Sequence, residues 1–219
     1  MKTLAVSLAG LVVLGAAPLS ESTTASGLKE ALRVATERAV QSTSKANGFL
    51  DNPEIRIGLP GKLSAVATAM RGIGMGAQVD ELEVAMNRAA EKAAGEATPV
   101  FVDAIQQMGF QDARGILSGG DTAATQYFEK TTTEPLRARF EPIVAQAMKS
   151  VGVTKLYDQL VGSYTSAVPF GSAPKLDLNR YVTDETLDGL FTVVGEEEKT
   201  IRTNPSARAT DILKQVFGR

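Results

Sequence analysis

The sequence predicts an all-α protein: a single compact multi-helix domain of about nine or ten helices, preceded by a cleaved signal peptide. From Ser26 onward, apolar residues recur at spacings of three and four, and no segment shows the convincing alternation of a half-buried strand. The connections between these periodic runs reach at most ~13 residues, which favours one domain over residues 26–219. With 219 residues, 43% of them hydrophobic and 22% charged, the chain is large enough for a sizeable core.

The residue types that are missing exclude several classes of function. The chain contains no His, no Cys and no Trp. It therefore has no Ser-His-Asp triad, no Cys-His pair, no thiolate or imidazole metal site and no disulfide. The formal net charge of -2 argues against nucleic-acid binding, which normally needs a basic excess. We therefore expect no cofactor, no metal and no nucleic-acid partner.

Residues 1–20 have the features of a secretory signal peptide. Lys2 precedes an uncharged apolar run of about 14 residues, which small residues and Pro18 follow. The run is shorter than the ~20 residues of a permanent membrane span, and no later segment is long and apolar enough to span. We expect cleavage between residues 17 and 20, a periplasmic or secreted product, and no transmembrane helix in the mature chain. The alternative is an uncleaved membrane anchor.

The first helices are predicted from caps, breakers and periodicity. Ser26 is a candidate N-cap for a helix over residues 27–45, which Asn47-Gly48 should end. Prolines bias residues 52–60 toward an extended conformation, with a brief strand expected around 55–57. Further helices are expected at residues 61–71, 77–94, 98–108 and 111–117. Segment 77–94 has the clearest apolar stripe, which is rich in alanine and consists of Val79, Leu82, Met86, Ala89 and Ala93.

The second half of the chain is predicted to be helical as well. Asp121 should cap one helix and Thr133–Val151 should form the next, with a kink, or two abutting helices, near Glu141 because Pro142 follows. Another helix starts at Thr154. After a short turn at residues 178–182, a long helix should run from Thr183 toward Arg202. The last begins at Asn204-Pro205, and its apolar side carries Ile212, Leu213, Val216 and Phe217.

Residues 163–175 form the longest turn-rich stretch and the best candidate for a mobile loop. Val168 and Phe170 are apolar residues within it, and apolar side chains in an exposed loop usually dock somewhere. We expect them either to form a lid over a cavity or to plug the core.

Several segments also carry a resemblance to a known family. They are Gly27–Leu32, Gly48–Pro53, Val79–Glu83, Met86–Glu91, Phe101–Ile105, Ile116–Ala124 and Tyr181–Glu198. Together they resemble the bacterial family catalogued as domain of unknown function 4197, secreted proteins of about this length, over nearly the whole mature chain. The resemblance implies a bacterial envelope protein, and it implies no substrate, activity or catalytic residue.

The most suggestive local string is Gly119-Gly120-Asp121, a glycine turn that opens a helix and exposes N–H groups able to hold an anion. We favour the plainer interpretation of a helix stop followed by an N-cap, because an Asp cap would satisfy those N–H groups and repel an anion.

Polar residues on the helix over 77–94 are the second candidate. Arg88 could join Glu81 and Glu91 in an ion-pair network, with Asn87 beside Glu91 on one flank. We expect a solvated face, with a functional polar groove as the alternative.

Other acidic patterns are weaker. Residues 184–189 imitate the first half of a calcium loop, but position twelve is a glycine and an unbroken helix fits the apolar spacing better. Asp103 and Asp188 lie in apolar stretches and are the candidate carboxylates for acid–base catalysis.

Three functions remain open from the sequence. The favoured one is a non-enzymatic envelope protein that binds or assembles with an envelope protein, a lipid or a cell-wall component. The alternatives are a carrier of a small apolar ligand, with the 163–175 loop as lid, and a carboxylate-based hydrolase.

Overall fold

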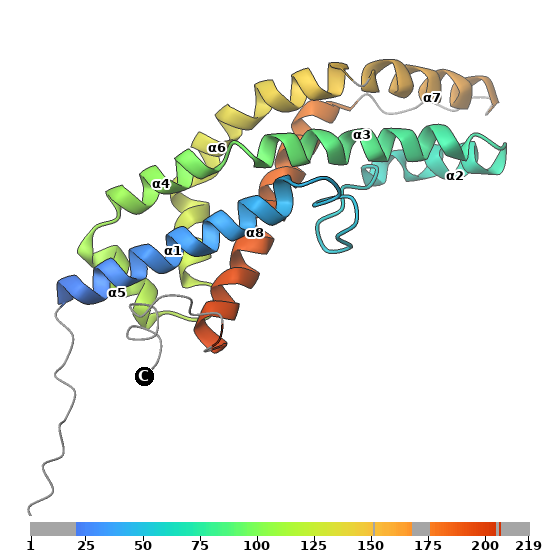
Figure 1. Ribbon diagram of the computed structural model, residues 1–219. Helices are drawn as coiled ribbons and strands as arrows, with labels where there is room; N and C mark the ends of the chain where they lie inside the picture. Colours follow the sequence, from blue (N-terminus) through green and yellow to red (C-terminus); the bar gives the residue numbers. More distant parts are fainter. Residues whose placement is uncertain (1–20, 151, 168–175, 205, 207–219) are drawn as a thin grey trace, which may run out of the picture.

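The computed structural model describes residues 21–150, 152–167, 176–204 and 206 (Figure 1). All regular secondary structure in these residues is helical, which confirms the all-α class. The elements are α1 (Glu21–Ser44), the 3-10 helix η1 (Gly61–Leu63), α2 (Ser64–Gly72), α3 (Gly76–Ala94), α4 (Thr98–Gln107), α5 (Phe110–Ser118), α6 (Ala123–Ser150), α7 (Val153–Ala167) and α8 (Leu178–Thr203).

The described residues contain eight α-helices, fewer than the nine or ten predicted. One reason is that the helices expected before and after residue 133 form the single helix α6. Another is that most of the helix expected from Asn204-Pro205 lies outside the described residues, as do residues 1–20.

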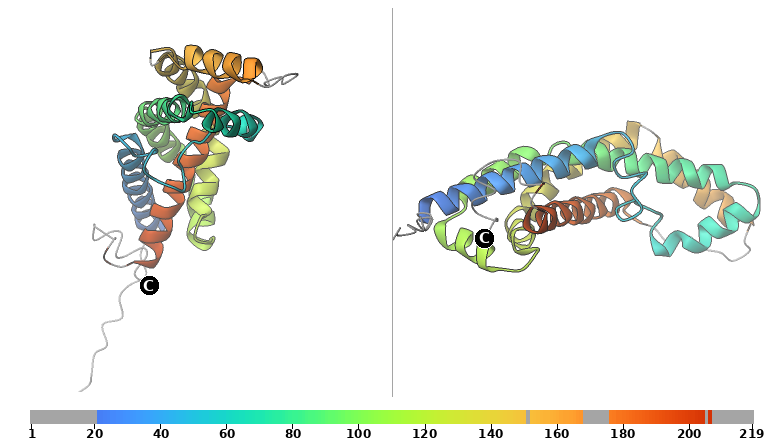
Figure 2. Two further views of the ribbon diagram at one scale, coloured as in Figure 1. Left: turned by 90° about the vertical axis from the view of Figure 1, so that its right-hand side faces the viewer. Right: turned by 60° about the horizontal axis from the view of Figure 1, so that its bottom comes forward.

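The molecule is elongated, and α8 crosses its middle (Figures 1 and 2). Helices α1, α4 and α5 lie toward one end, while α2, α3 and α7 extend toward the other (Figure 1). Helix α6 packs along α8 and also contacts α3, α4, α5 and α7. One hydrophobic cluster includes side chains from all eight of these α-helices.

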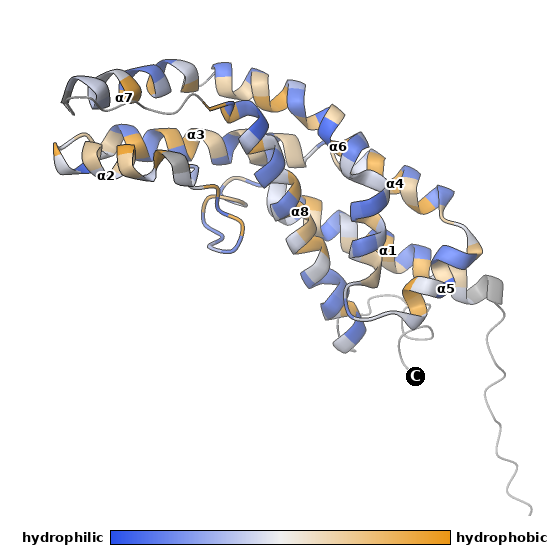
Figure 3. Cartoon of the chain, turned by 180° about the vertical axis from the view of Figure 1, so that it is seen from behind, coloured by the Kyte–Doolittle hydropathy of each residue, from blue (hydrophilic) through white to orange (hydrophobic). Residues whose placement is uncertain are grey.

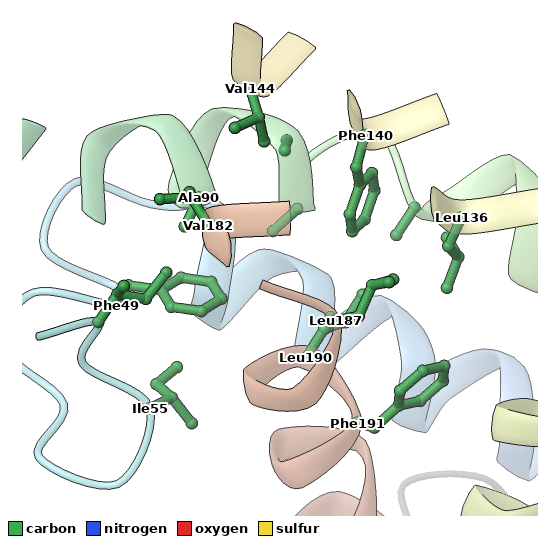
Figure 4. Close-up of a cluster of buried hydrophobic side chains, with 14 of the residues drawn as sticks. Phe49, Ile55, Ala90, Leu136, Phe140, Val144, Val182, Leu187, Leu190 and Phe191 are labelled. Carbon is green, nitrogen blue, oxygen red and sulfur yellow. The ribbon is translucent and has the colours of Figure 1, made fainter. Parts of the chain in front are cut away.

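Helix α8 supplies the centre of this cluster (Figure 4). The ring of Phe191 lies edge-on to Phe101 of α4, with 6.3 Å between ring centroids, and Phe101 meets Phe128 of α6 at 5.3 Å. On another side of α8, Gly189 admits Phe49 from the loop after α1. A Cβ atom at residue 189 would lie 2.6 Å from Phe49 Cε1, so only glycine allows this approach.

Helix α6 bends along its length (Figure 1), and it contains both Pro135 and Pro142. Each proline removes one helical hydrogen bond without ending the helix. The hydroxyls of Thr131, Thr132 and Thr133, just before Pro135, donate to carbonyls four residues earlier, a pattern that also bends helices. Of the two alternatives expected near Glu141, a kink or two abutting helices, the structure has one continuous, bent helix.

The loop after α1 is held by buried polar side chains rather than by a strand. The brief strand expected around residues 55–57 is absent from the described loop. Instead, the Ile57 N–H donates to Asn87 Oδ1 at 2.9 Å, and Asn87 Nδ2 donates back to the Ile57 carbonyl at 2.8 Å. Asn87, on α3, therefore offers Ile57 the two hydrogen bonds that a neighbouring strand would offer.

Glu91, one turn further along α3, holds the start of the same loop. Its Oε1 accepts from the N–H groups of Phe49 and Leu50 at 3.3 and 3.4 Å. Its Oε2 accepts from Arg88 Nη1 at 2.7 Å, and Arg88 also bonds the side chain of Asn47. Asn87 and Glu91 are buried, so the expectation that they belong to a solvated face was wrong.

A second buried carboxylate, that of Glu198 on α8, caps α6. It accepts from the N–H groups of Ala124 and Thr125 at 2.9 and 2.8 Å, and from the Thr125 hydroxyl at 2.8 Å. Arg202 donates to it from Nε and Nη2 at 2.9 and 2.7 Å. The expected N-cap role of Asp121 was therefore wrong. The N–H groups at the start of α6 donate instead to Glu198, which lies on α8 much later in the chain.

Three helix boundaries also differ from expectation. Helix α1 begins at Glu21, so Ser26 lies inside it rather than at its cap. Helix α7 continues to Ala167, so the first residues of the expected 163–175 loop are helical. Helix α8 begins at Leu178, because the Asp177 side chain accepts from the Arg180 N–H at 3.0 Å and caps it there.

Glu198→Ala is expected to lower the free energy of unfolding by about 3–5 kcal/mol, because it leaves Arg202 and the first turn of α6 without their buried acceptor. Denaturant unfolding followed by far-UV circular dichroism measures this loss. Glu197→Ala is the matched control: its carboxylate is partly exposed and lies 3.7 Å from Arg38, so its loss should cost less than ~1 kcal/mol. Similar small effects for both variants would contradict the capping role.

Candidate functional site

A groove runs between α6 and α8, the two helices that pack along each other. Its volume is about 980 Å³, near the upper end of the ~300–1,000 Å³ typical of ligand pockets. The groove is open to solvent rather than enclosed. Its lining is Thr122 from the turn before α6, then Thr125, Gln126, Glu129, Thr133 and Arg137 from α6, and Arg180, Asp184, Leu187, Asp188, Phe191, Thr192, Gly195, Glu196 and Lys199 from α8.

The groove has an apolar floor and polar walls. Leu187 and Phe191 are 2% and 6% exposed, so they present only small apolar surfaces at the bottom. Gly195 lies beside Thr125, where a Cβ atom would make an ordinary van der Waals contact with the threonine hydroxyl oxygen at 3.6 Å. Figure 3 shows hydrophilic and hydrophobic residues along both α6 and α8. The two helices thus bury part of their surface and leave a polar part for the groove.

Threonine hydroxyls line both walls. Thr133 donates to the Glu129 carbonyl at 2.6 Å, and Thr192 donates to the Asp188 carbonyl at 2.9 Å. Because these bonds use the hydroxyl protons, the lone pairs that remain on each oxygen can accept a hydrogen bond. The walls therefore offer acceptors to a ligand that carries N–H groups.

An ion pair joins the two walls at one end of the groove. Arg137 of α6 donates from Nη1 to Asp184 of α8, and this hydrogen bond raises the pKa of Arg137 above its usual range. Arg180 Nε lies 3.9 Å from the other carboxylate oxygen of Asp184. Asp184 thus lies between two guanidinium groups, and its ion pair with Arg137 links α8 to α6.

Other carboxyl groups in the groove hold their protons more tightly than usual. Burial is the main cause of the raised pKa of Asp188, the charge of Asp184 adds to it, and Arg137 opposes it. Glu196 also has a raised pKa, chiefly because its carboxyl is hydrogen-bonded to that of Glu54, with burial as the next cause. Raised carboxyl pKa values in a concave site are typical of functional surfaces, although structural ion-pair clusters produce them too.

An anion held at Gly119-Gly120-Asp121, the less favoured interpretation of this string, would need the N–H groups at the start of α6. The turn does precede a helix, as expected, but the N–H groups of Ala124 and Thr125 already hold the Glu198 carboxylate. Asp121 is exposed in the turn. The sequence did not identify Glu198 as the acceptor for these N–H groups, because it lies 74 residues from Ala124. Its i,i+4 spacing to Arg202 suggested only a helix-stabilising pair.

Arg88 and Glu81 do not join that turn in one site. Arg88 belongs to the cluster with Asn47 and Glu91, and it forms its ion pair with Glu91 at 2.7 Å. Both residues border a hollow between α3 and α7, away from the start of α6. The two polar candidates, Gly119-Gly120-Asp121 and Glu81 with Arg88, therefore lie in separate places.

The remaining predicted residues have mixed outcomes. Asp103 is exposed on α4, whereas Asp188 lines the groove, and the groove lining does not include Asp103. Residues 184–189 are part of the continuous helix α8, as the preferred interpretation held. Among the described residues no group of three or more acidic side chains is placed to hold a metal ion. Val168 and Phe170 lie outside the described residues.

The fold and the groove define an all-helical protein with an open, polar surface channel. The chain belongs to the family described as protein of unknown function (DUF4197), whose model matches residues 18–218, and this confirms the resemblance found in the sequence. No curated protein and no solved structure matches the chain. Across the described residues, no helix has the length and apolar character needed to cross a membrane.

Asp188→Asn is expected to be neutral or to stabilise the fold by a few tenths of a kcal/mol at pH 7. The raised pKa means that the folded protein binds this proton more tightly than the unfolded chain, so the charged form opposes folding at neutral pH. That cost disappears as the pH falls through the folded pKa, and the advantage of the variant should disappear with it. Unfolding free energies at pH 7 and near pH 4 measure both effects.

The environment of Asp188 can also be tested by following the titration of its carboxyl group with NMR. Arg137 lowers the pKa of Asp188, so Arg137→Gln should raise that pKa further. An Asp188 pKa at its ordinary value in the unaltered protein, or one that Arg137→Gln lowers, would contradict this account.

Proposed function

We propose that this protein is a non-enzymatic binding or assembly factor of the bacterial envelope, and that it holds a polypeptide segment of a partner protein in the groove between α6 and α8. The observation that carries the proposal is the groove itself, about 980 Å³ of open space with charged and hydrogen-bonding walls over an apolar floor. The family supplies no activity, so the argument rests on the chemistry of these walls.

The state of the carboxylates favours binding over catalysis. Asp184 is tied to Arg137, and Asp188 projects from the same helix one turn later. Hydrolysis by paired carboxyl groups needs two of them on opposite sides of the reacting bond. Asp184 and Asp188 share one wall, and the carboxylate of the facing wall, Glu129, is exposed to water. Asp188 is also exposed to water, whereas catalytic proton transfer gains from a site that excludes it.

A polypeptide suits the walls better than an apolar ligand or a glycan does. An apolar ligand would strip water from Arg137, Asp184 and their neighbours without giving them new partners, which costs free energy. The one aromatic ring in the groove lining, that of Phe191, is only 6% exposed, so it offers no face on which a sugar ring could stack. A peptide supplies backbone N–H groups for the threonine oxygens, charged side chains for the walls and apolar side chains for the floor.

Site-specific photo-crosslinking in cells of the native host tests this proposal. A photoreactive residue at Gln126, in the groove, should give a discrete adduct that protease treatment of the partner shortens. Thr131 is the matched control, because it is exposed on the same helix but does not line the groove. The same photoreactive residue at Thr131 should give no such adduct.

Blocking the groove should remove the adduct. Thr192→Arg places a long charged side chain between the walls, and we expect it to lower the Gln126 adduct at least about tenfold, whereas Thr131→Arg should leave it unchanged. A protease-resistant adduct would point to a lipid or glycan and would contradict the polypeptide proposal, as would an adduct that Thr192→Arg leaves intact.

The envelope location is the second part of the proposal. The apolar run in residues 1–20 supports export. The mass of the mature protein recovered from the native host should correspond to an N-terminus between residues 18 and 21. A product that retains Met1 in the membrane fraction would contradict cleavage and would favour an anchored protein.

A further inference from the structure

A second groove lies at the opposite end of the molecule from α2, between the start of α1 and α5. It has a volume of about 400 Å³, and its apolar lining comes from Ala25, Phe110, Ala113 and Leu117. The ring of Phe110 is 42% exposed, which is unusual for a large aromatic side chain. Together with the apolar groove that it borders, Phe110 offers a surface that another apolar segment could cover.

Helix α8 ends beside this groove. Arg202, in its last turn, donates from Nη2 to the carbonyl of Ile116 in α5 at 2.9 Å. Ile116 is the neighbour of Leu117, which lines the groove. The chain therefore leaves α8 next to the groove, and residues 207–219 continue from there beyond the described part of the structure.

The sequence of residues 207–219 has the pattern that such a groove requires. Ile212, Leu213, Val216 and Phe217 recur at the spacing of one face of a helix, while the residues between them are polar. A helix over residues 212–219 would be ~12 Å long, close to the ~14 Å that the nine residues of α5 span. The few residues between Ser206 and Ile212 suffice to reverse the chain direction.

We propose that the C-terminal segment, residues 207–219, docks its apolar face into the groove between α1 and α5 and covers Phe110. Its attachment to α8 gives the segment a millimolar effective concentration at the groove, so modest apolar contacts are enough to hold it there. This surface is separate from the groove between α6 and α8, so the inference is independent of the proposed function.

Thiol protection in the full chain tests this docking. The protein has no cysteine, so a single introduced thiol reports alone. Ser118 is exposed and lines the groove, whereas Thr154 is exposed on α7 and serves as the control. We expect Ser118→Cys to react with a maleimide at least about tenfold more slowly than Thr154→Cys.

Substitutions in the tail identify the cause of the protection. Leu213→Asp together with Phe217→Asp should raise the Ser118→Cys rate to that of Thr154→Cys, while Gln215→Asp, on the polar side, should leave the protection intact. Thr154→Cys in each tail variant verifies that the fold is preserved. Equal Ser118→Cys rates with and without the paired tail substitutions would overturn the proposal. Protection that increases with protein concentration would also overturn it, because the tail of a second copy would then be the occupant.

Discussion

The arrangement of α5, α6 and α8 depends on one buried ion pair, Glu198 with Arg202. A charge inside a protein is tolerated only when it is paired and fully hydrogen-bonded, and the Glu198 carboxylate accepts from two N–H groups, one hydroxyl and one guanidinium. Arg202 then extends to the Ile116 carbonyl of α5. Sliding α8 along α6 would take the carboxylate away from its three donors on Ala124 and Thr125 and leave it only Arg202 of its own helix, so these bonds fix how the two helices are aligned.

The same principle holds the irregular loop after α1. A chain without disulfides must hold its loops by other means, and here Asn87 and Glu91 of α3 serve the backbone groups of Ile57, Phe49 and Leu50. The loop in turn places Phe49 against Gly189 in the centre of the core (Figure 4). Buried polar groups therefore position an apolar contact, and the apolar contact shields them from water.

Helix periodicity predicted most of the fold, because an apolar stripe depends on neighbours three and four residues apart. The stripe over 77–94 identified α3 within one residue of its start. Asn87 and Glu91 of the same helix were expected on a solvated face. Their burial depends on loop residues that lie 30 and 42 positions earlier in the chain, which local sequence does not show. Asp121 was chosen as a cap for the same reason: local sequence could not show that Glu198 would come from α8. The groove was missed because its walls, such as Arg137 and Asp184, meet only once α6 and α8 have packed.

The ties between α6 and α8 also determine what the groove can bind. Glu198 joins Thr125 near one end, and Asp184 joins Arg137 near the other, so both walls are fixed before any ligand arrives. A preformed groove loses little conformational entropy on binding, which makes modest contacts with a peptide sufficient. It also limits adaptation: a ligand must match the existing spacing of threonine oxygens and charges. Under the proposed function, the ion pairs that stabilise the fold would also set the selectivity of the groove, since loosening one of them would change the spacing of its walls.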